Sequence, residues 1–417
     1  MSEPVADVVI VGAGAAGLAT AIFTAREQPA ASIALLDGAR APGAKILVSG
    51  GGRCNVTNRE VTEADFNGGS RAAIRRVLQA LPVAATVDFF AGLGVPLHEE
   101  SDGKLFPDAN RARSVLDALL GECRGCGVRL LAGHRVTAVE PAAPVGFDVH
   151  TSAGTMRTRR VVLATGGRSL PRTGSDGAGY DLAQRFGHTL VPTTPALVPL
   201  VLGDGPHAEL SGVSQPVGLT LSVGGRRPVR VTGPLLWAHF GVSGPAVLDM
   251  SRHWLRARLD GHATTLAANL LPDTDFAGAD QWLVEMARER PRLLVVNALA
   301  HRIPAAVGGV VCRLAQVDAE TAVGQLTRDA RRSLAHALTA WRLPVLDSRG
   351  YDHAEATAGG IALHEIDPRS MQSRECPGLF LVGEMLDVDG RLGGFNFQWA
   401  WASAKAAARG IVATLSS

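Results

Sequence analysis

The stretch that decides the fold is Val8-Val9-Ile10-Val11-Gly12-Ala13-Gly14-Ala15-Ala16-Gly17. An apolar strand runs into a G-x-G-x-x-G turn, a helix of small residues follows, and Asp37 ends the next predicted strand. In this pattern Gly12 permits the tight turn, Gly14 lets the backbone approach a pyrophosphate, and Gly17 lets the helix pack closely against the strand. The stretch therefore predicts a βαβ unit that binds a dinucleotide at the N-terminus of its helix.

Asp37 bears on which dinucleotide would fit. It lies 20 residues after Gly17, where a carboxylate can accept hydrogen bonds from the ribose hydroxyls. A carboxylate at this position argues against a 2′-phosphate, so the pattern favours FAD or NAD over NADP, although Arg40 nearby would suit a phosphate. A glycine-rich turn without a ligand is the alternative, because glycines are common in turns.

The composition and charge exclude several classes of protein. The chain has 417 residues, of which 46% are apolar and 19% charged, and this suits two or three globular domains. The formal net charge of +2 provides no electrostatic case for nucleic acid or a membrane surface. No apolar run spans a bilayer, no signal peptide pattern is present, and five cysteines do not suggest a disulfide framework. We expect a cytoplasmic protein that acts on a small molecule, without metal, nucleic acid or membrane, and its oligomeric state stays open.

The composition and patterning of the sequence change three times along the chain. Residues 1–192 contain the dinucleotide pattern and short strands, one of which ends in Ala164-Thr165-Gly166. Residues 193–275 are rich in Pro and Gly with alternating apolar positions, and residues 276–347 have a helical, arginine-rich pattern. The glycine-rich texture returns over 348–417. We predict an α/β nucleotide-binding domain, formed by the two ends of the chain and interrupted by a β-rich and a helical domain.

Three separated segments are predicted to converge on one ligand: Gly12–Gly17, Ala164–Gly167 and Gly383–Asn396. The carboxyl ends of parallel strands meet at one edge of a sheet. Glu384 would then lie near the ribityl hydroxyls of a flavin. The helix after Asn396 would point its N-terminus at the flavin pyrimidine ring, where it can stabilise negative charge on reduction. A dehydrogenase that binds only NAD needs no strand and helix from the C-terminal part of the chain at this site, so the pattern indicates FAD.

Several blocks of the sequence resemble those of a known family. They are Gly50–Asn55, Ala164–Gly167, Thr173–Tyr180, Pro199–Leu200, His239–Ala246, Ala358–Ile361 and, most specific, Gly383–Gly390 with Gly394–Ala400. Together they resemble the BaiN-like FAD-binding flavoproteins, a group of NAD(P)/FAD-dependent oxidoreductases that includes aminoacetone-oxidase-type enzymes. The resemblance covers nearly the whole chain. It implies a Rossmann-type FAD domain of the two-dinucleotide-binding flavoprotein type, with an inserted β-rich domain and a helical domain.

The resemblance also implies that the glycine-rich loop around Arg53 wraps the flavin. Charge-assisted donors in and before this loop suit a pyrophosphate or the flavin carbonyls. Motifs and resemblance together predict these cofactor-binding residues: Gly12, Gly14, Ala15, Ala16, Gly17, Asp37, Lys45, Ser49, Gly51, Gly52, Arg53, Cys54, Asn55, Val136, Ala164, Thr165, Gly166, Gly383, Glu384, Gly393, Gly394, Phe395 and Asn396. Two positions depart from the family pattern. Leu170 stands where an aromatic residue is expected, which bears on a substrate contact, and Asp37 stands where Glu is commoner, which leaves ribose binding intact.

His239 is the candidate catalytic residue, as a proton donor to a substrate above the flavin. A hydrogen-bonded structural histidine is the alternative. Arg53 could acidify the neighbouring thiol of Cys54, but no partner cysteine lies within a few residues, so we expect Cys54 to be a small residue packed beside the flavin. Cys123 and Cys126 form a C-x-x-C pair without a second metal-binding pair, and we interpret it as incidental.

These observations predict an FAD-dependent oxidoreductase that transfers hydride through flavin N5. The sequence has no second G-x-G-x-x-G unit, so NAD(P)H, if it is the electron donor, would dock transiently. The favoured interpretation is NAD(P)H-driven reduction of a small organic substrate with a conjugated C=C bond. The alternatives are an amine or amino-ketone oxidase that uses O2, and a non-catalytic FAD-binding protein.

Overall fold

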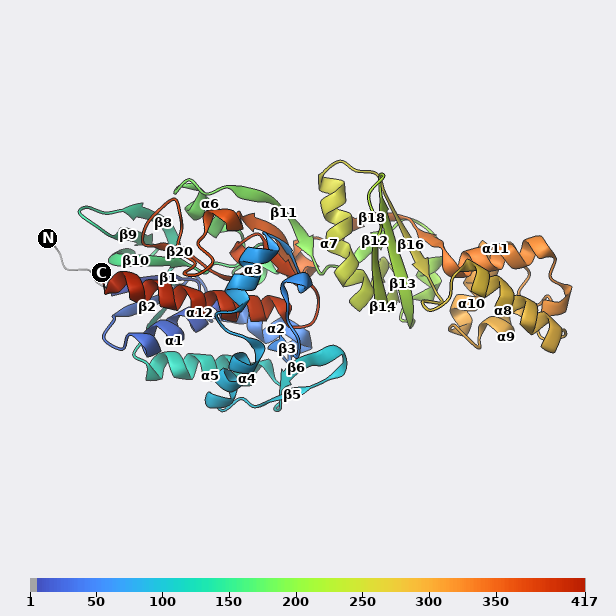
Figure 1. Cartoon of the computed structure of the whole chain (residues 1–417), viewed down its shortest axis with the longest axis horizontal. Helices are drawn as coiled ribbons and strands as arrows, with labels where there is room; N and C mark the ends of the chain where they lie inside the picture. Colours follow the sequence, from blue (N-terminus) through green and yellow to red (C-terminus); the bar gives the residue numbers. More distant parts are fainter. Residues whose placement is uncertain (1–5, 417) are drawn as a thin grey trace. The chain divides into compact units, whose positions relative to one another are not determined.

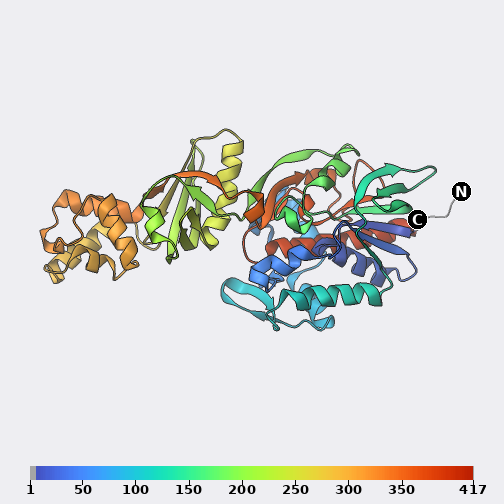
Figure 2. The ribbon, with the colours of Figure 1, turned by 180° about the vertical axis from the view of Figure 1, so that it is seen from behind.

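The computed structural model describes residues 6–416, and the chain divides into two compact units (Figure 1). Unit 1 holds the described residues up to Pro195 and from Glu355 onward, and unit 2 is Ala196–Ala354. The sequence placed the corresponding borders at 192/193 and 347/348. In Figure 2, which shows the ribbon from behind, the blue N-terminal and red C-terminal segments of unit 1 interleave. Unit 1 is therefore built from both ends of the chain.

A parallel sheet forms the centre of unit 1. Its strands follow the order β7 (Arg129–Ala132), β2 (Ile33–Asp37), β1 (Ala6–Val11) and β10 (Gly154–Leu163), and β20 (Leu379–Leu381) also pairs with β10. These neighbours are all parallel, with Val9 opposite Ala34 on one side and Val161 on the other. The strands β9 (Phe147–Thr151) and β8 (Val136–Pro141) extend the sheet in antiparallel fashion. The central strands are buried along nearly their whole length, which explains their unbroken apolar sequences.

Two helices made mainly of small residues pack against each other beside this sheet (Figure 1). They are α1 (Ala15–Glu27) and α12 (Phe395–Leu415), and ten of the 13 residues of α1 are buried. Helix α1 begins after Gly14, which is extended with φ −82° and ψ −168°. Helix α12 begins after Gly394, whose φ of +91° is readily adopted only by glycine. Both helices therefore start at glycines that the sequence singled out.

The other elements of unit 1 connect segments that are distant in sequence. Its remaining helices are α2 (Ala44–Gly52), α3 (Arg71–Leu78), α4 (Val83–Gly92), α5 (Ala112–Gly125) and α6 (Ala178–Gln184). Three small sheets pair β3 (Thr57–Asn58) with β6 (Lys104–Pro107) and β6 with β5 (Leu97–Glu99), β4 (Phe66–Gly68) with β21 (Val388–Gly390), and β11 (Leu190–Ala196) with β19 (Ala356–Ile361). The β4–β21 pair holds the C-terminal glycine-rich segment beside the early part of the chain.

Unit 2 contains an antiparallel sheet and a group of helices. The sheet order is β17 (Trp341–Leu343), β16 (Thr264–Asn269), β13 (Ser214–Val223), β14 (Val229–Ala238), β15 (Gly241–Ser243), β12 (Leu200–Leu202) and β18 (Val345–Ser348). The helices are α7 (Pro245–Leu259), α8 (Phe276–Glu289), α9 (Val295–Leu299), α10 (Ala305–Leu314) and α11 (Arg328–Thr339). This order confirms the antiparallel pairing expected from the alternating segments.

The strands and helices of unit 2 share one hydrophobic core. Strands β17 and β18 follow the helices in sequence and form the two edges of the sheet. Trp237 of β14 stacks on Trp341 of β17 with ring centroids 4.8 Å apart, and Leu283 and Leu334 of the helices belong to the same core. The sheet is thus completed by residues that lie beyond the predicted border at 275/276. Independent folding of a β-rich and a helical domain stays a prediction.

Candidate functional site

The turn after β1 is built from glycines for two different reasons. Gly12 has a φ of +104°, and a Cβ there would lie 2.5 Å from the carbonyl oxygen of Ala164. A Cβ on Gly17 would lie 1.8 Å from the carbonyl oxygen of Gly12. Packing therefore requires glycine at both positions. A Cβ on Gly14, in contrast, would meet no atom within 4 Å, so the space in front of α1 is open to a ligand.

The start of α1 suits an anion. The amides of Ala15, Ala16 and Gly17 lie in the first turn of the helix, where N–H groups have no partner within the helix and the helix dipole is positive. Asp37 lies at the end of the neighbouring strand β2, where its two carboxylate oxygens accept the N–H groups of Ala13 and Ala39, each at 2.8 Å. Asp37 thus orders the turn and remains partly exposed beside it.

The three predicted segments meet at the carboxyl edge of the parallel sheet. Ala164 donates its N–H to the carbonyl of Val11 at 2.8 Å, and Val382 donates to the carbonyl of Leu163 at 3.0 Å. Gly383 follows with a φ of +74°. A Cβ on Gly383 would lie 2.7 Å from Cβ of Ala16 in α1. The ends of β1, β10 and β20 therefore surround the start of α1.

A polar cluster lies next to this junction. Glu384 accepts a hydrogen bond from the Ser169 hydroxyl at 2.6 Å and forms an ion pair with Lys45, which also donates to Ser169. The Lys45 and Glu384 side chains are 26% and 19% exposed. Thr357 accepts the Ser169 N–H at 3.1 Å, and this fixes the segment after Gly166. Sequence reasoning predicted Lys45 and Glu384 but missed Ser169, for which a hydroxyl close after Gly166-Gly167 is the only signal.

The glycine-rich C-terminal end of α2 has a non-helical backbone. Gly50, Gly51 and Gly52 all have positive φ, and a Cβ on Gly51 would meet nothing within 4 Å. The hydroxyl of Ser49 donates to the Ile46 carbonyl at 2.7 Å. The backbone of this segment is thus exposed to solvent at Gly51 and Gly52.

Arg53 and Cys54 have protein partners that the sequence did not indicate. Arg53 pairs with Glu100 at 2.6 Å and lies over the Phe106 ring, 4.1 Å from its centroid. This hydrogen bond holds the pKa of Glu100 below its usual range. Cys54 is fully buried in the core. Burial raises the pKa of the Cys54 thiol to about 12, against a smaller opposing effect of a hydrogen bond with Ser49. Flavin contacts of these two residues stay predictions.

The segment before α12 is held by asparagines. Asn396 accepts the Gly390 N–H at 2.8 Å and donates to the Gly390 carbonyl at 3.0 Å. Asn58, which the sequence analysis did not single out, donates to the carbonyl of Gly393 at 3.1 Å. The amide oxygen of Asn55 faces the Gly394 N–H at 3.1 Å in the orientation that satisfies its neighbours. Phe395 is buried in the core. The start of α12 is therefore rigidly tied to the loop after α2.

Two further predicted residues belong to other elements of the chain. Val136 is half-buried on β8, opposite Thr151. His239 belongs to unit 2, where its side chain is exposed and its ring packs edge-on against Phe240 at 5.2 Å. Thr165 follows β10. Helix α6 packs closely against it, since a Cβ on Gly179 would lie 1.8 Å from Oγ1 of Thr165. The roles of Val136 and His239 stay predictions.

The residues at the sheet edge fit FAD. An open space at a helix N-terminus suits a pyrophosphate, and a partly exposed carboxylate at Asp37 suits a ribose. Within residues 6–416, no group of three His, Cys, Asp or Glu side chains could hold a metal ion.

We expect the thiols of Cys54 and Cys123 to resist alkylation in the folded protein. Burial raises the pKa of each to about 12, so at pH 8 only about one thiol in 10⁴ is ionised. Iodoacetamide labelling followed by mass spectrometry checks this, with the urea-unfolded protein as the fully reactive control. Labelling of Cys54 in the folded protein at the rate of a free thiol would contradict it and would favour a redox role.

Comparisons with known proteins extend this picture to the whole chain. The family profile described as "HI0933-like protein Rossmann domain" matches residues 6–410. "Ribosomal RNA dihydrouridine synthase" of Escherichia coli (strain K12) is 34% identical over 414 residues, which is 99% of each chain. "3-dehydro-bile acid delta(4,6)-reductase" of Clostridium scindens is 32% identical over 400 residues, or 96% of this chain and 97% of that protein. The solved 3-ketosteroid delta1-dehydrogenase from Sterolibacterium denitrificans has a TM-score of 0.51 at 14% identity, covers 98% of this chain and 99% of that chain, and shares the fold.

These matches confirm the predicted fold class, a Rossmann-type FAD-binding domain, and the predicted class of enzyme. They also confirm the resemblance to the BaiN-like flavoproteins. Among residues 6–416, no helix combines the length and apolar character needed to cross a membrane. The chain belongs to the HI0933-like family of Rossmann-type FAD-dependent oxidoreductases.

Proposed function

We propose that this oxidoreductase reduces a carbon–carbon double bond conjugated with a carbonyl group. The names of two relatives that match almost the whole chain carry the proposal. Dihydrouridine is uridine with its C5=C6 bond reduced, and that bond is conjugated with the C4 carbonyl. The double bonds named in the bile acid reductase are conjugated with a 3-oxo group. Each reduction adds a hydride at the electron-poor end of the conjugated double bond, which is the β carbon in a simple enone, and a proton at the other carbon of that bond.

Unit 1 would hold the cofactor for this reaction. FAD, when bound, supplies the hydride. The amides at the start of α1 would bind its pyrophosphate, in the open space beside Gly14, and Asp37 would bind its adenosine ribose. Lys45 neutralises the carboxylate of Glu384 while leaving that carboxylate able to accept a hydroxyl hydrogen bond. We therefore assign the Glu384 cluster to the ribityl side of the flavin.

The proton for the α carbon requires a second group. His239 is our candidate, because its imidazole is exposed and histidine is the side chain that most often serves as a general acid. A His239→Asn variant is expected to reduce the rate of C=C reduction by about 10²-fold, the usual range for loss of a general acid, while reduction of the flavin by its donor stays unchanged. Equal rates of both half-reactions in the variant and wild type would exclude His239 as the proton donor.

The electron donor and the substrate are tested in two steps. Anaerobic stopped-flow absorbance of the FAD-loaded protein with NADH, and then with NADPH, checks whether a nicotinamide reduces the flavin. The reduced protein is then mixed with a steroid enone or with a uridine-containing RNA, and reoxidation is followed at the flavin band. We expect reoxidation by at least one of these conjugated substrates.

The outcomes separate the proposed function from its alternatives. Product with two added hydrogens at the conjugated bond, identified by mass spectrometry, supports the reductase. Flavin that is reduced by an amine and reoxidised only by O2 would instead establish the oxidase. The sequence charge favoured a small substrate without nucleic acid, whereas one relative is named for ribosomal RNA, so both substrate classes belong in the assay.

A further inference from the structure

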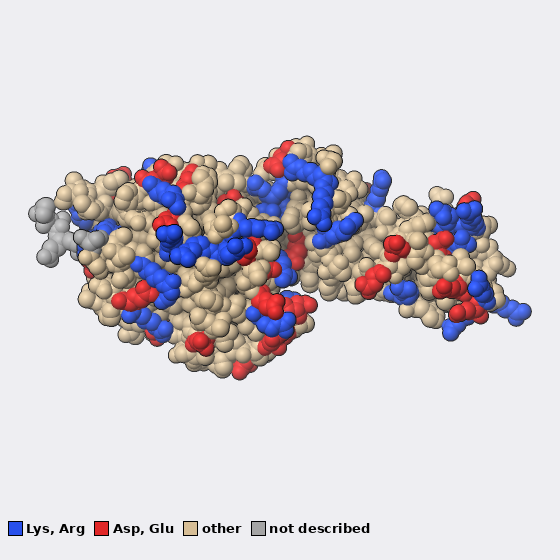
Figure 3. All heavy atoms as spheres, viewed as in Figure 1, with Lys and Arg blue, Asp and Glu red and all other residues tan. Residues whose placement is uncertain are grey.

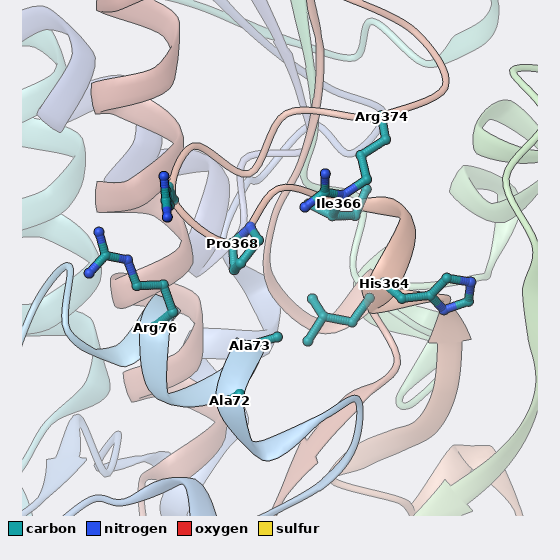
Figure 4. Close-up of a pocket in the computed structure, with 9 residues that line it drawn as sticks. Ala72, Ala73, Arg76, His364, Ile366, Pro368 and Arg374 are labelled. Atoms are coloured by element: carbon teal, nitrogen blue, oxygen red, sulfur yellow. The ribbon is translucent and has the colours of Figure 1, made fainter.

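A basic cavity lies on the surface of unit 1, between α3 and the segment from Leu363 to Arg374 (Figure 4). Its volume is about 430 Å³. Arg76 comes from the last turn of α3, and Arg369, Arg374 and His364 come from the opposite segment. In Figure 4, Arg76 and Arg374 flank the apolar surface of Pro368 from opposite sides. The other lining residues are apolar, and no carboxylate lines the cavity.

The three guanidinium groups carry charges that no nearby carboxylate neutralises. Over the described residues 6–416, Arg76, Arg369 and Arg374 form no ion pair within 4 Å, whereas Arg75 on the same helix pairs with Glu63. Arg76 donates a side-chain hydrogen bond to the amide oxygen of Gln79 at 3.4 Å. Like charges that share a cavity repel each other. A planar guanidinium fork matches the oxygens of a phosphate, so an anionic ligand would relieve this repulsion.

Two carboxylates of the segment that lines the cavity, Glu365 and Asp367, accept hydrogen bonds from groups other than the three guanidinium groups. Glu365 points inward, where it accepts hydrogen bonds from His188 and from the N–H of Thr189, each at 2.9 Å. Asp367 accepts the N–H of Arg369 at 3.0 Å and so shapes the turn that presents this arginine. Glu365 and Asp367 are therefore engaged within the structure, and neither lines the cavity.

A buried hydrogen-bond network holds the backbone of this segment in place. The ring of His188 also contacts the hydroxyl of Ser373 at 2.8 Å, and that hydroxyl accepts the N–H of Cys376 at 2.9 Å. A Cβ on Gly410 of α12 would lie 2.6 Å from the carbonyl oxygen of Ser370, so the loop packs directly on that helix. The cavity thus has a fixed frame that carries three long, exposed cations.

The segment that lines the cavity is hydrogen-bonded to a strand that leads to the predicted cofactor site. Leu381 of β20 donates its N–H to the carbonyl of Met371 at 3.1 Å, so the loop lies beside the strand that leads to Gly383 and Glu384. On the face shown in Figure 3, Lys and Arg side chains form a band over the region of α3. The sequence of α3, Arg71-Ala-Ala-Ile-Arg-Arg-Val-Leu78, contributes three arginines to that region.

We propose that this cavity binds backbone phosphates of a single-stranded RNA that carries the base to be reduced. The inference rests on the proposed function, because a uracil ring has the required conjugated double bond and one full-length relative is named for ribosomal RNA. Arg76, Arg369 and Arg374 bind the phosphate oxygens, and the apolar surface around Pro368 faces the sugar or a neighbouring base. Phosphate contacts position a nucleic acid without reading its sequence, so the cavity sets where the strand lies.

The test measures RNA binding by the FAD-loaded protein rather than catalysis. Fluorescence anisotropy with a labelled 20-nucleotide uridine-containing RNA is recorded between 50 and 200 mM KCl. The triple variant R76A/R369A/R374A is compared with R111A/R113A/R124A, which removes three exposed arginines at α5. We expect at least tenfold weaker binding at 50 mM KCl for the first variant. Its plot of log affinity against log salt should be less steep by about 2, since each single-strand phosphate contact contributes about 0.7.

A charge-conserving variant keeps the test independent of folding. R76K/R369K/R374K should retain the wild-type salt slope, and flavin absorbance reports the integrity of each variant. Equal RNA affinity and equal slopes in the two alanine variants would overturn the phosphate site. A second assay, reduction of a small enone, separates this inference from the proposed function. If the wild type reduces neither the enone nor uridine but still binds RNA more tightly than R76A/R369A/R374A, the proposed function is overturned and the phosphate site stands.

Discussion

A Gly14→Val variant is expected to fold normally and to lose FAD. A Cβ on Gly14 meets no atom within 4 Å, and its φ of −82° is open to valine. The valine side chain would therefore occupy the free space in front of α1, which the pyrophosphate requires. We expect the Kd for FAD to rise at least 100-fold, or about 3 kcal/mol. Titration of the apoprotein with FAD, followed by flavin fluorescence, measures this.

Two matched glycine variants make the result specific. A Gly121→Ala change in α5 also meets no atom within 4 Å, but it lies in a helix away from the turn, so FAD binding should be unchanged. A Gly17→Ala change places a Cβ 1.8 Å from the Gly12 carbonyl oxygen and should destabilise the apoprotein itself. Wild-type affinity for FAD in Gly14→Val would place the cofactor away from the turn.

A His188→Ala variant is expected to destabilise unit 1 by about 3 kcal/mol. His188 is 3% exposed, and its ring nitrogens contact Glu365 and Ser373 at 2.9 and 2.8 Å. Alanine would leave the carboxylate of Glu365 buried without one of its partners, a change that costs about 3–5 kcal/mol in other buried pairs. For a unit of this size, a loss of about 3 kcal/mol lowers the unfolding midpoint by roughly 6–12 °C. Differential scanning calorimetry of the apoprotein measures the shift.

The same network gives stability a defined pH dependence. Burial alone would raise the pKa of Glu365, but hydrogen bonds from Thr189 and His188 outweigh burial and hold that pKa below its usual value of 4.5. A carboxyl group whose pKa is lower in the folded state stabilises the protein above its unfolded pKa and loses that contribution as pH falls. As the pH falls from about 5 through the unfolded pKa of 4.5 toward the lower folded pKa, unfolding midpoints should therefore fall more steeply in wild type than in Glu365→Gln.

A solvent-exposed histidine serves as the control for both experiments. His364 is the neighbouring residue, and its side chain is 82% exposed. His364→Ala should leave the unfolding midpoint within about 1 °C, because exposed substitutions usually change stability by less than 0.5 kcal/mol. A midpoint for His188→Ala equal to that of His364→Ala would mean that the buried network does not stabilise the unit.

The geometry of the turn between β1 and α1 was predictable because it is local in sequence, and its contacts with a cofactor stay predictions. Gly12, Gly14, Gly17 and Asp37 belong to a single βαβ unit, in which the spacing of residues determines the spacing of atoms. Glu384 was predictable for a similar reason, since it directly follows an apolar strand. The glycine requirement at Gly12 and Gly17 is now explained by close packing, and that at Gly14 by open space.

Other features of the site depended on neighbours that the sequence does not reveal. Ser169 contacts Glu384 across 215 positions because β10 and β20 are adjacent and parallel. A cofactor contact of Arg53 stays a prediction, and its guanidinium also has Glu100 and Phe106 as partners within the protein, which the sequence did not indicate. A hydroxyl or an arginine in a loop has no local pattern that names its partner, so these contacts could not be predicted from the sequence.

The sequence by itself determined the Rossmann-type fold and the dinucleotide-binding turn, because both follow from a backbone pattern within one βαβ unit. The interruption of the domain was visible as changes of composition along the chain. Only the tertiary structure decided which polar side chains meet. His188 reaches Glu365 and Ser373 across 177 and 185 positions, and Arg76 shares a cavity with Arg369 and Arg374. Such contacts between distant residues depend on strand order, register and helix packing. These arise from the burial of apolar surface over the whole unit.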